Sequence, residues 1–175
     1  MSGKAAGQRL GRVMLILAWG LGLWLLTRWF GDYEMHRQNP NQAPVSRHAE
    51  GYVEVSLLSN SSGHFVTSGS LNGESVTFIV DTGATDVALS AELAAKLKLP
   101  RGGAVILSTA NGRVQGWRTR ITELRLGDIV LNDVRALVAP NIDGEQVLLG
   151  MSALRQLEFT QRGGTLLLRQ HTTQE

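Results

Sequence analysis

Residues 76–85 read VTFIVDTGAT, an apolar β-type run that delivers one aspartate, Asp81, into a tight Thr-Gly-Ala turn. A carboxylate at the end of a buried strand costs free energy unless it is paired, hydrogen-bonded or engaged in chemistry. Gly83 permits a turn that a Cβ atom would crowd, and it lets backbone N–H groups approach the carboxylate. The stretch therefore predicts a buried strand whose end presents Asp81 as a functional side chain.

The composition of the chain fits one modest domain with appendages, because its 175 residues show no internal repeat. The sequence holds no cysteine, which excludes a disulfide framework, a thiolate metal site and a cysteine nucleophile. The four histidines lie far apart without ligand spacing, so we expect no metal site and no cofactor. The arginines are scattered, with little aromatic interleaving, so we expect no nucleic-acid partner.

An apolar segment near the amino terminus predicts a transmembrane helix over residues 13–30. Residues 13–27 carry no charge, and a helix from Leu10 to Phe30 would be about 31 Å long, against about 30 Å for the hydrocarbon core of a bilayer. A cleaved signal peptide also begins with a basic stretch and an apolar run, but it needs small residues at its cleavage site. Bulky and charged residues follow this segment instead, which favours a retained anchor in the lipid bilayer.

The charges that flank this segment predict its orientation. Residues 1–12 contain three basic residues and no acidic one, whereas the basic residues just after the segment are offset by Asp32 and Glu34. Positive charge is retained on the cytoplasmic side of a membrane. We therefore expect a cytoplasmic basic tail at residues 1–12 and, in a bacterial inner membrane, a periplasmic location for the residues after the anchor.

The segment 31–50 is expected to link the anchor to the rest of the chain. It is polar, contains Pro40 and Pro44, and has no sustained periodicity. Such a composition is typical of a flexible stalk rather than of a packed element.

From residue 52 onward, short apolar runs alternate with turns, and two Asn-Gly pairs at 72–73 and 111–112 are strong hairpin signals. Ser90 is expected to cap one short helix, and a second helix is expected over 152–157. The pattern predicts a compact, mainly β domain over residues 51–170, followed by a tail at 171–175. The expected strands cover residues 52–57, 64–71, 75–80, 104–110, 113–121, 122–126, 129–130, 134–139, 146–149 and 166–168.

Over about residues 52–170 the chain resembles the retropepsin-like aspartic proteases, in particular the bacterial single-pass members. The resemblance rests on FIVDTGAT at 78–85, on the hairpin signal at 111–112 where the family has its flap, and on LLGMSAL at 148–154. The last segment looks like the strand, glycine and carboxy-terminal helix of the family. The resemblance implies a single-lobed closed β fold that works as a homodimer, with one aspartate from each protomer at the two-fold axis.

The resemblance also implies which residues carry the chemistry. The Asp-Thr-Gly triplet occurs once, so both carboxylates of the family's dyad would be Asp81, one from each protomer, acting on a peptide or protein substrate. The implied catalytic residues are Asp81, Thr82 and Gly83. The implied substrate-binding residues are Ala84, Thr85, Asp86, Ala110, Asn111 and Gly112. The residues implied to support the site are Leu148, Leu149 and Gly150.

The sequence departs from the retroviral pattern at two positions. Those family members usually carry an aspartate where this chain has Thr85 and an arginine where it has Met151. The two family residues form an ion pair that supports the dimer, and both are missing here together. We therefore expect a different dimer contact, which a shared membrane would assist by raising the effective concentration of the two chains.

Two alternative interpretations stay open at this point. Asp81 could be a turn aspartate that only caps local backbone. The same fold could also serve as a non-proteolytic peptide-binding or dimerisation module, because a fold does not determine a function. Other readings fail. A phosphate loop of the actin type would need two α/β domains, and residues 150–154 (GMSAL) lack the second glycine of a serine nucleophile elbow.

Overall fold

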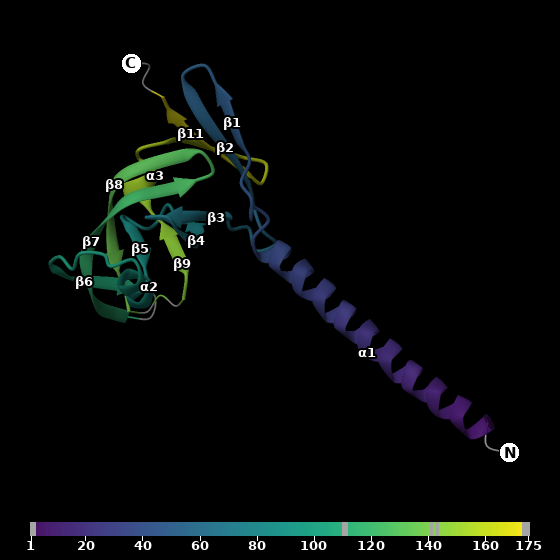
Figure 1. Ribbon diagram of the computed structural model, residues 1–175. Coiled ribbons are helices and arrows are strands. Elements are labelled where there is room, and N and C mark those ends of the chain that lie inside the picture. The colour runs from purple at the N-terminus through teal and green to yellow at the C-terminus, as the bar shows by residue number, and fades with distance from the viewer. Residues whose placement is uncertain (1–2, 110–111, 141, 143, 173–175) are drawn as a thin grey trace. The chain divides into compact units, whose positions relative to one another are not determined.

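The structure is a computed structural model that describes residues 3–109, 112–140, 142 and 144–172. The chain divides into two units, a helical one that ends at Arg37 and a folded one that begins at Gln38. Each unit is described by itself below (Figure 1).

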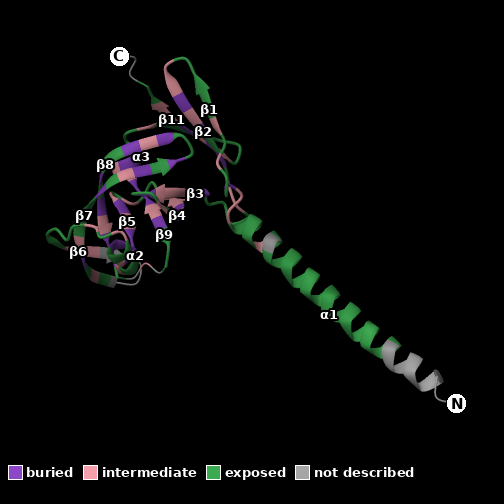
Figure 2. Ribbon diagram, viewed as in Figure 1, coloured by how far each residue is buried: buried purple, intermediate pink, exposed green. Residues whose placement is uncertain are grey.

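The first unit consists of the long helix α1 (Gly3–Gln38). Its part from Gly11 to Gln38 contains an 18-residue window with a mean hydropathy of 1.6, and by length and composition it could cross a membrane. The described side chains along this part are almost all exposed, including its leucines and tryptophans (Figure 2). An apolar surface on all sides is typical of helices that are buried in a large protein core or span a membrane.

The folded unit is built around a closed seven-stranded sheet, which confirms the predicted mainly β closed fold. The order of its strands is β3-β4-β9-β5-β8-β7-β6, and the additional pairing of β3 with β7 closes it. Most neighbours are antiparallel, but β4 pairs with β9 in parallel, and so does β5 with β8. The strands are β3 (Val66–Leu71), β4 (Glu74–Val80), β5 (Val87–Leu89), β6 (Ala104–Thr109), β7 (Gly112–Leu126), β8 (Ile129–Val138) and β9 (Gln146–Leu149).

A second, four-stranded antiparallel sheet has the order β1-β2-β11-β10. Its buried side chains alternate along β2 and β11, and they join the core of the closed sheet in one hydrophobic cluster (Figure 2). Two short helices complete the unit, one after β5 and one after β9. These elements are β1 (Ser46–Ala49), β2 (Tyr52–Leu58), β10 (Glu158–Arg162), β11 (Thr165–His171), α2 (Ala91–Lys96) and α3 (Met151–Leu154).

Several local predictions are confirmed by the structure. The hairpin between β3 and β4 turns at Asn72 and Gly73, both at positive φ, as a type I′ turn requires. The Ser90 side chain caps α2 by accepting a hydrogen bond from the Leu93 backbone N–H at 3.0 Å. β6 and β7 form the expected antiparallel pair, although residues 110 and 111 of their connection lie outside the described residues.

Other elements differ from the prediction. β7 and β8 each form one strand where two were expected, because the register of their pairing is the same on both sides of Thr122 and Asp133, where polar residues interrupt the apolar pattern. β5 and β10 were not predicted. β10 carries no buried side chain, so it leaves no apolar alternation in the sequence.

The structure also differs from the flexible stalk that was predicted for residues 31–50. Helix α1 continues to Gln38, and residues 46–49 form β1, which pairs with β2. Between them, the buried Asn41 side chain donates hydrogen bonds to the carbonyls of Leu58 at 2.9 Å and Val66 at 2.7 Å. Its Oδ1 accepts a third from the Leu58 N–H at 2.7 Å. Backbone groups from two distant strands are thus satisfied by one side chain, which a local sequence pattern does not predict.

We predict that Asn41→Ala lowers the free energy of unfolding by about 2–4 kcal/mol, because it leaves buried backbone groups of β2 and β3 without partners. Urea unfolding followed by circular dichroism measures this loss. Gln42→Ala, one residue further along and exposed, is the matched control and should stay within about 0.5 kcal/mol of wild type. An Asn41→Ala protein as stable as the control would contradict the role assigned to this side chain.

Candidate active site

Asp81 follows directly on β4, and the pairing of that strand determines where the aspartate lies. Val76 and Phe78 are buried and hold β4 against the core. β4 pairs in parallel with β9 up to Val80 opposite Leu149, and the Asp81 N–H then donates to the Leu149 carbonyl at 3.2 Å. Asp81 is therefore the first residue beyond the end of β4. That strand end is held both by buried side chains of β4 and by the backbone pairing with β9.

The chain reverses immediately after Asp81. The Gly83 N–H donates to Asp81 Oδ1 at 2.9 Å, and the Ala84 N–H donates to the Asp81 carbonyl at 3.2 Å. Thr82 and Gly83 are exposed, whereas Asp81 is half-buried. The turn orients one carboxylate oxygen by a backbone N–H and leaves the loop open to a partner or a substrate.

Gly150 supports the loop from the other side. A Cβ atom at this position would lie 2.3 Å from the Asp86 carbonyl oxygen and 2.9 Å from that of Ala84. The next residue, Met151, donates its N–H to the same Ala84 carbonyl at 2.8 Å. The requirement for glycine is therefore one of close backbone approach, because its φ of −87° is open to any residue. Leu149 and Gly150 thus lie against the Asp81 loop, and Leu148, one residue before them, pairs with Ile79 of β4.

Ser152 contributes to the same support, a role that the sequence analysis did not predict. Its Oγ accepts a hydrogen bond from the Val87 N–H at 2.9 Å and donates one to the Arg135 carbonyl at 2.7 Å. One hydroxyl thereby joins α3, β5 and β8 behind the loop. In the sequence, Ser152 is a small hydroxyl residue two positions after Gly150. The segment does not match a serine nucleophile motif, because it lacks that motif's second glycine.

The substrate-binding residues suggested by the sequence divide into two groups. Thr85 is exposed and Asp86 half-buried, and both belong to the segment that leads from the Asp81 turn into β5. Ala110 and Asn111 lie outside the described residues, while Gly112 opens β7 opposite Thr109 of β6.

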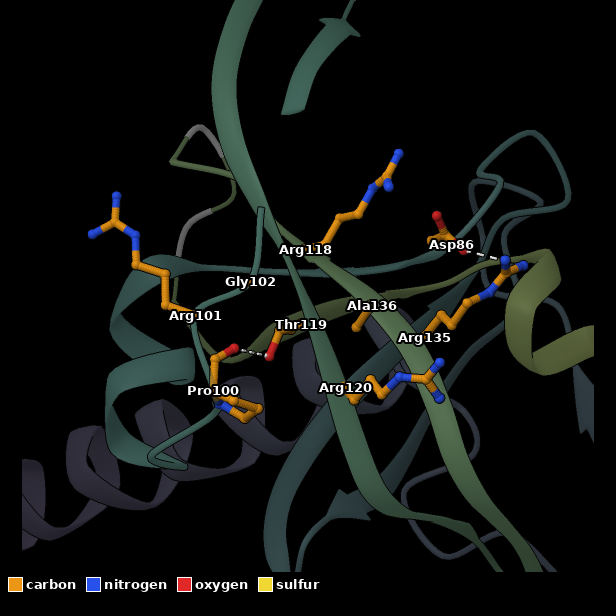
Figure 3. A pocket seen from close by; sticks show the side chains of 9 residues that line it. All are labelled: Asp86, Pro100, Arg101, Gly102, Arg118, Thr119, Arg120, Arg135 and Ala136. Carbon is orange, nitrogen blue, oxygen red and sulfur yellow. Dashed lines mark hydrogen bonds and ion pairs between the residues drawn. The ribbon is translucent and has the colours of Figure 1, made fainter. Parts of the chain in front are cut away.

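A pocket of about 520 Å³ opens beside Asp86, between β7, β8 and the segment that follows α2 (Figure 3). Its wall is held by backbone contacts, because the Gly102 N–H donates to the Arg118 carbonyl at 2.8 Å and the Thr119 hydroxyl donates to the Pro100 carbonyl at 2.7 Å. The side chains that give it charge are Asp86, Arg101, Arg118, Arg120 and Arg135.

The described residues include no group of three or more His, Asp or Glu side chains that could hold a metal ion. The chemistry that the site itself offers is that of one oriented carboxylate on an open loop. The Asp-Thr-Gly triplet occurs once in the sequence, so each chain supplies one such carboxylate.

Comparisons with known proteins also point to an aspartic protease family. The sequence model of the gag-polyprotein putative aspartyl protease family matches residues 67–156, a range that holds the Asp81 loop, β9 and α3. An uncharacterised protein encoded in the cobV 5′ region of a Sinorhizobium species is 36% identical over 135 residues, which are 75% of this chain. The chain spans 58% of the length of that relative.

Among solved structures, a retropepsin-like aspartic protease from Rickettsia conorii superposes with a TM-score of 0.56 at 28% identity. The match covers 73% of this chain and 95% of that one. The chain therefore belongs to the retropepsin-like aspartic protease family.

Proposed function

We propose that the protein is a membrane-anchored aspartic endopeptidase, active as a homodimer in which each protomer contributes one Asp81. The observation that carries the proposal is the Asp81 loop: a single carboxylate, oriented by the Gly83 N–H at the end of a buried strand, on an exposed turn. A carboxylate that only capped local backbone would need neither the exposed turn nor the close support from Gly150.

In the proposed dimer, the two Asp81 carboxylates share one proton, since two carboxylates at contact distance cannot both ionise; this is the established behaviour of aspartic-protease dyads. The ionised carboxylate acts as general base on a water molecule, and the protonated one polarises the peptide carbonyl. Thr82 would hold the two loops together across the two-fold axis. Gly83 would contact the substrate backbone, and residues 110–112 would close over the substrate by adding strand-like hydrogen bonds.

The proposed dimer contact uses strand β10. In the described structure this strand lies at the edge of its sheet, pairs with β11 on one side, and has all five side chains exposed. Phe159, in its centre, is 40% exposed. An edge strand presents unpaired N–H and C=O groups that another strand can complete. Antiparallel pairing of two β10 strands would make one continuous sheet across a two-fold axis, and it needs no ion pair at Thr85 and Met151.

The proposed anchor is α1, whose part from Gly11 to Gln38 contains a window long and apolar enough to cross a membrane. The charge bias of its flanks favours a cytoplasmic amino terminus and a periplasmic protease unit. Two chains confined to one membrane meet at a higher effective concentration than two chains free in solution, which favours a dimer held by a short edge strand.

We predict that Asp81→Asn lowers peptidase activity about 10³-fold or more, because the amide can neither act as base nor share the proton. Digestion of a peptide library at acid and neutral pH, analysed by mass spectrometry, measures the activity. Asp128→Asn, an exposed aspartate in the turn between β7 and β8, is the matched control and should cleave like wild type. Cleavage by purified Asp81→Asn protein would refute the proposal, and unchanged phenotypes in cells would favour a non-proteolytic module.

We predict that mixing wild-type and Asp81→Asn chains lowers activity more steeply than dilution does. With random pairing, activity per total chain follows the square of the wild-type fraction, so an equal mixture retains roughly a quarter. The chains are mixed in detergent, allowed to exchange, and assayed with one peptide. Activity strictly proportional to the wild-type fraction would identify a self-sufficient monomer.

We predict that α1 is an integral membrane helix with its amino terminus in the cytoplasm. The full chain should stay in the membrane fraction after alkaline carbonate extraction, and a cysteine introduced at Ser2 should resist a membrane-impermeant thiol reagent that labels one introduced at Thr173. Because the native chain has no cysteine, each label reports one position. Release by carbonate, or labelling of the amino-terminal position alone, would contradict this prediction.

A further inference from the structure

Three arginines lie together on one face of the pocket beside Asp86. Arg118 and Arg120 are two residues apart on β7 and so share one face of the sheet, and Arg135 of β8 stands directly opposite Arg120 in the register. Figure 3 shows the side chains of Arg120 and Arg135 extending to the same side, with that of Arg118 above them. Like charges directly opposite across two strands are destabilising, so this arrangement costs the fold free energy.

The acidic side chains nearby neutralise this cluster only in part. Arg120 forms an ion pair with Asp133. Arg135 Nη2 lies 3.8 Å from Asp86 Oδ1, which is too long for a hydrogen bond, and that oxygen is buried without a hydrogen-bond partner among the described residues. The guanidinium of Arg118 has neither an ion pair nor a hydrogen bond within the described part of the chain.

The pocket is connected to the candidate active site through short stretches of chain. Asp86, on its rim, follows Asp81 by five residues, so the two Cα atoms are at most about 17 Å apart. The Ser152 hydroxyl forms hydrogen bonds with both the Arg135 carbonyl and the Val87 N–H. These bonds hold β8, which carries Arg135, against the segment that follows the Asp81 loop. An extended peptide that crosses Asp81 would therefore reach Asp86, on the rim of the pocket, within about five residues at about 3.3 Å per residue.

We propose that this pocket binds an acidic side chain, Asp or Glu, of the peptide substrate, within about five residues of the scissile bond. The inference rests on the proposed peptidase function and adds a substrate class to it. A carboxylate is planar and can accept two parallel hydrogen bonds from one guanidinium. Arg118 donates these hydrogen bonds to the substrate carboxylate, because its guanidinium has no ion pair or hydrogen bond within the described part of the chain. Arg135 and Arg120 add positive charge to the same face.

Binding is measured with the full-length Asp81→Asn chain in zwitterionic nanodiscs, so that no peptide is cleaved. The probes are fluorescent twelve-residue peptides around a central pair of apolar residues, with Glu, Gln or Lys at one flanking position at a time. We expect the Glu peptide to bind about tenfold more tightly than the Gln peptide at one or two positions, as for a hydrogen bond to a charged group.

Adding Arg118→Gln should reduce this preference to about twofold or less, and Arg118→Glu should shift the preference to the Lys peptide. Arg155→Gln removes the same charge from an exposed arginine outside the pocket and should keep the tenfold preference. Unchanged thermal unfolding midpoints establish that the variants are folded. Equal binding of Glu and Gln peptides at every position, or the same preference in Arg118→Gln, would overturn the proposal.

Cleavage assays with the wild-type chain separate the two proposals. Cleavage without preference for Glu peptides would overturn the acidic subsite and leave the peptidase intact. Selective binding of Glu peptides without any cleavage would support the subsite and overturn the peptidase. Glycerophosphoserine, the soluble headgroup of an anionic lipid, serves as a competitor. If it binds more tightly than every Glu peptide and loses affinity in Arg118→Gln, the pocket binds lipid phosphate. That result would overturn the assignment to a substrate side chain.

Discussion

The parallel pairing of β4 with β9 is the constraint on which the rest of the site depends. It ends with the Asp81 N–H on the Leu149 carbonyl, and one residue later Gly150 touches the backbone of the loop that Asp81 begins. A shift of one residue would move Phe78 of β4, or Val147 and Leu149 of β9, out of the core, so the core also determines the position of the carboxylate. A reactive group on an exposed turn is thereby held by buried contacts.

Whether a feature of the fold or the site could be predicted from the sequence depended on how far apart along the chain its interacting residues lie. The turn at Asn72-Gly73 and the cap at Ser90 are determined by neighbours a few residues away, and the sequence predicted both. The role of Asn41 depends on carbonyls 17 and 25 residues further along, and that of Ser152 on a strand end 65 residues before it. Polar side chains that satisfy distant backbone groups leave no period in the sequence, so both were missed.

The departures from the retroviral pattern have a physical counterpart in the structure. At Thr85 and Met151 the side-chain ion pair is absent from the sequence, but the backbone bond from Met151 N–H to the Ala84 carbonyl still joins the same two segments. An acidic side chain follows one residue after Thr85: Asp86 Oδ1 lies 3.8 Å from Arg135 Nη2. In this chain the two segments are therefore joined by a backbone hydrogen bond rather than by an ion pair between residues 85 and 151.

The end of α1 has a consequence for how such a molecule would meet its partners. Only two residues separate Gln38, the last of the helix, from the buried Asn41, so the connector can extend at most about 10 Å. In the membrane-anchored dimer proposed above, both folded units would stay near one lipid surface, and their collision frequency would follow the number of chains per unit area of that membrane. Activity would then respond to crowding in two dimensions.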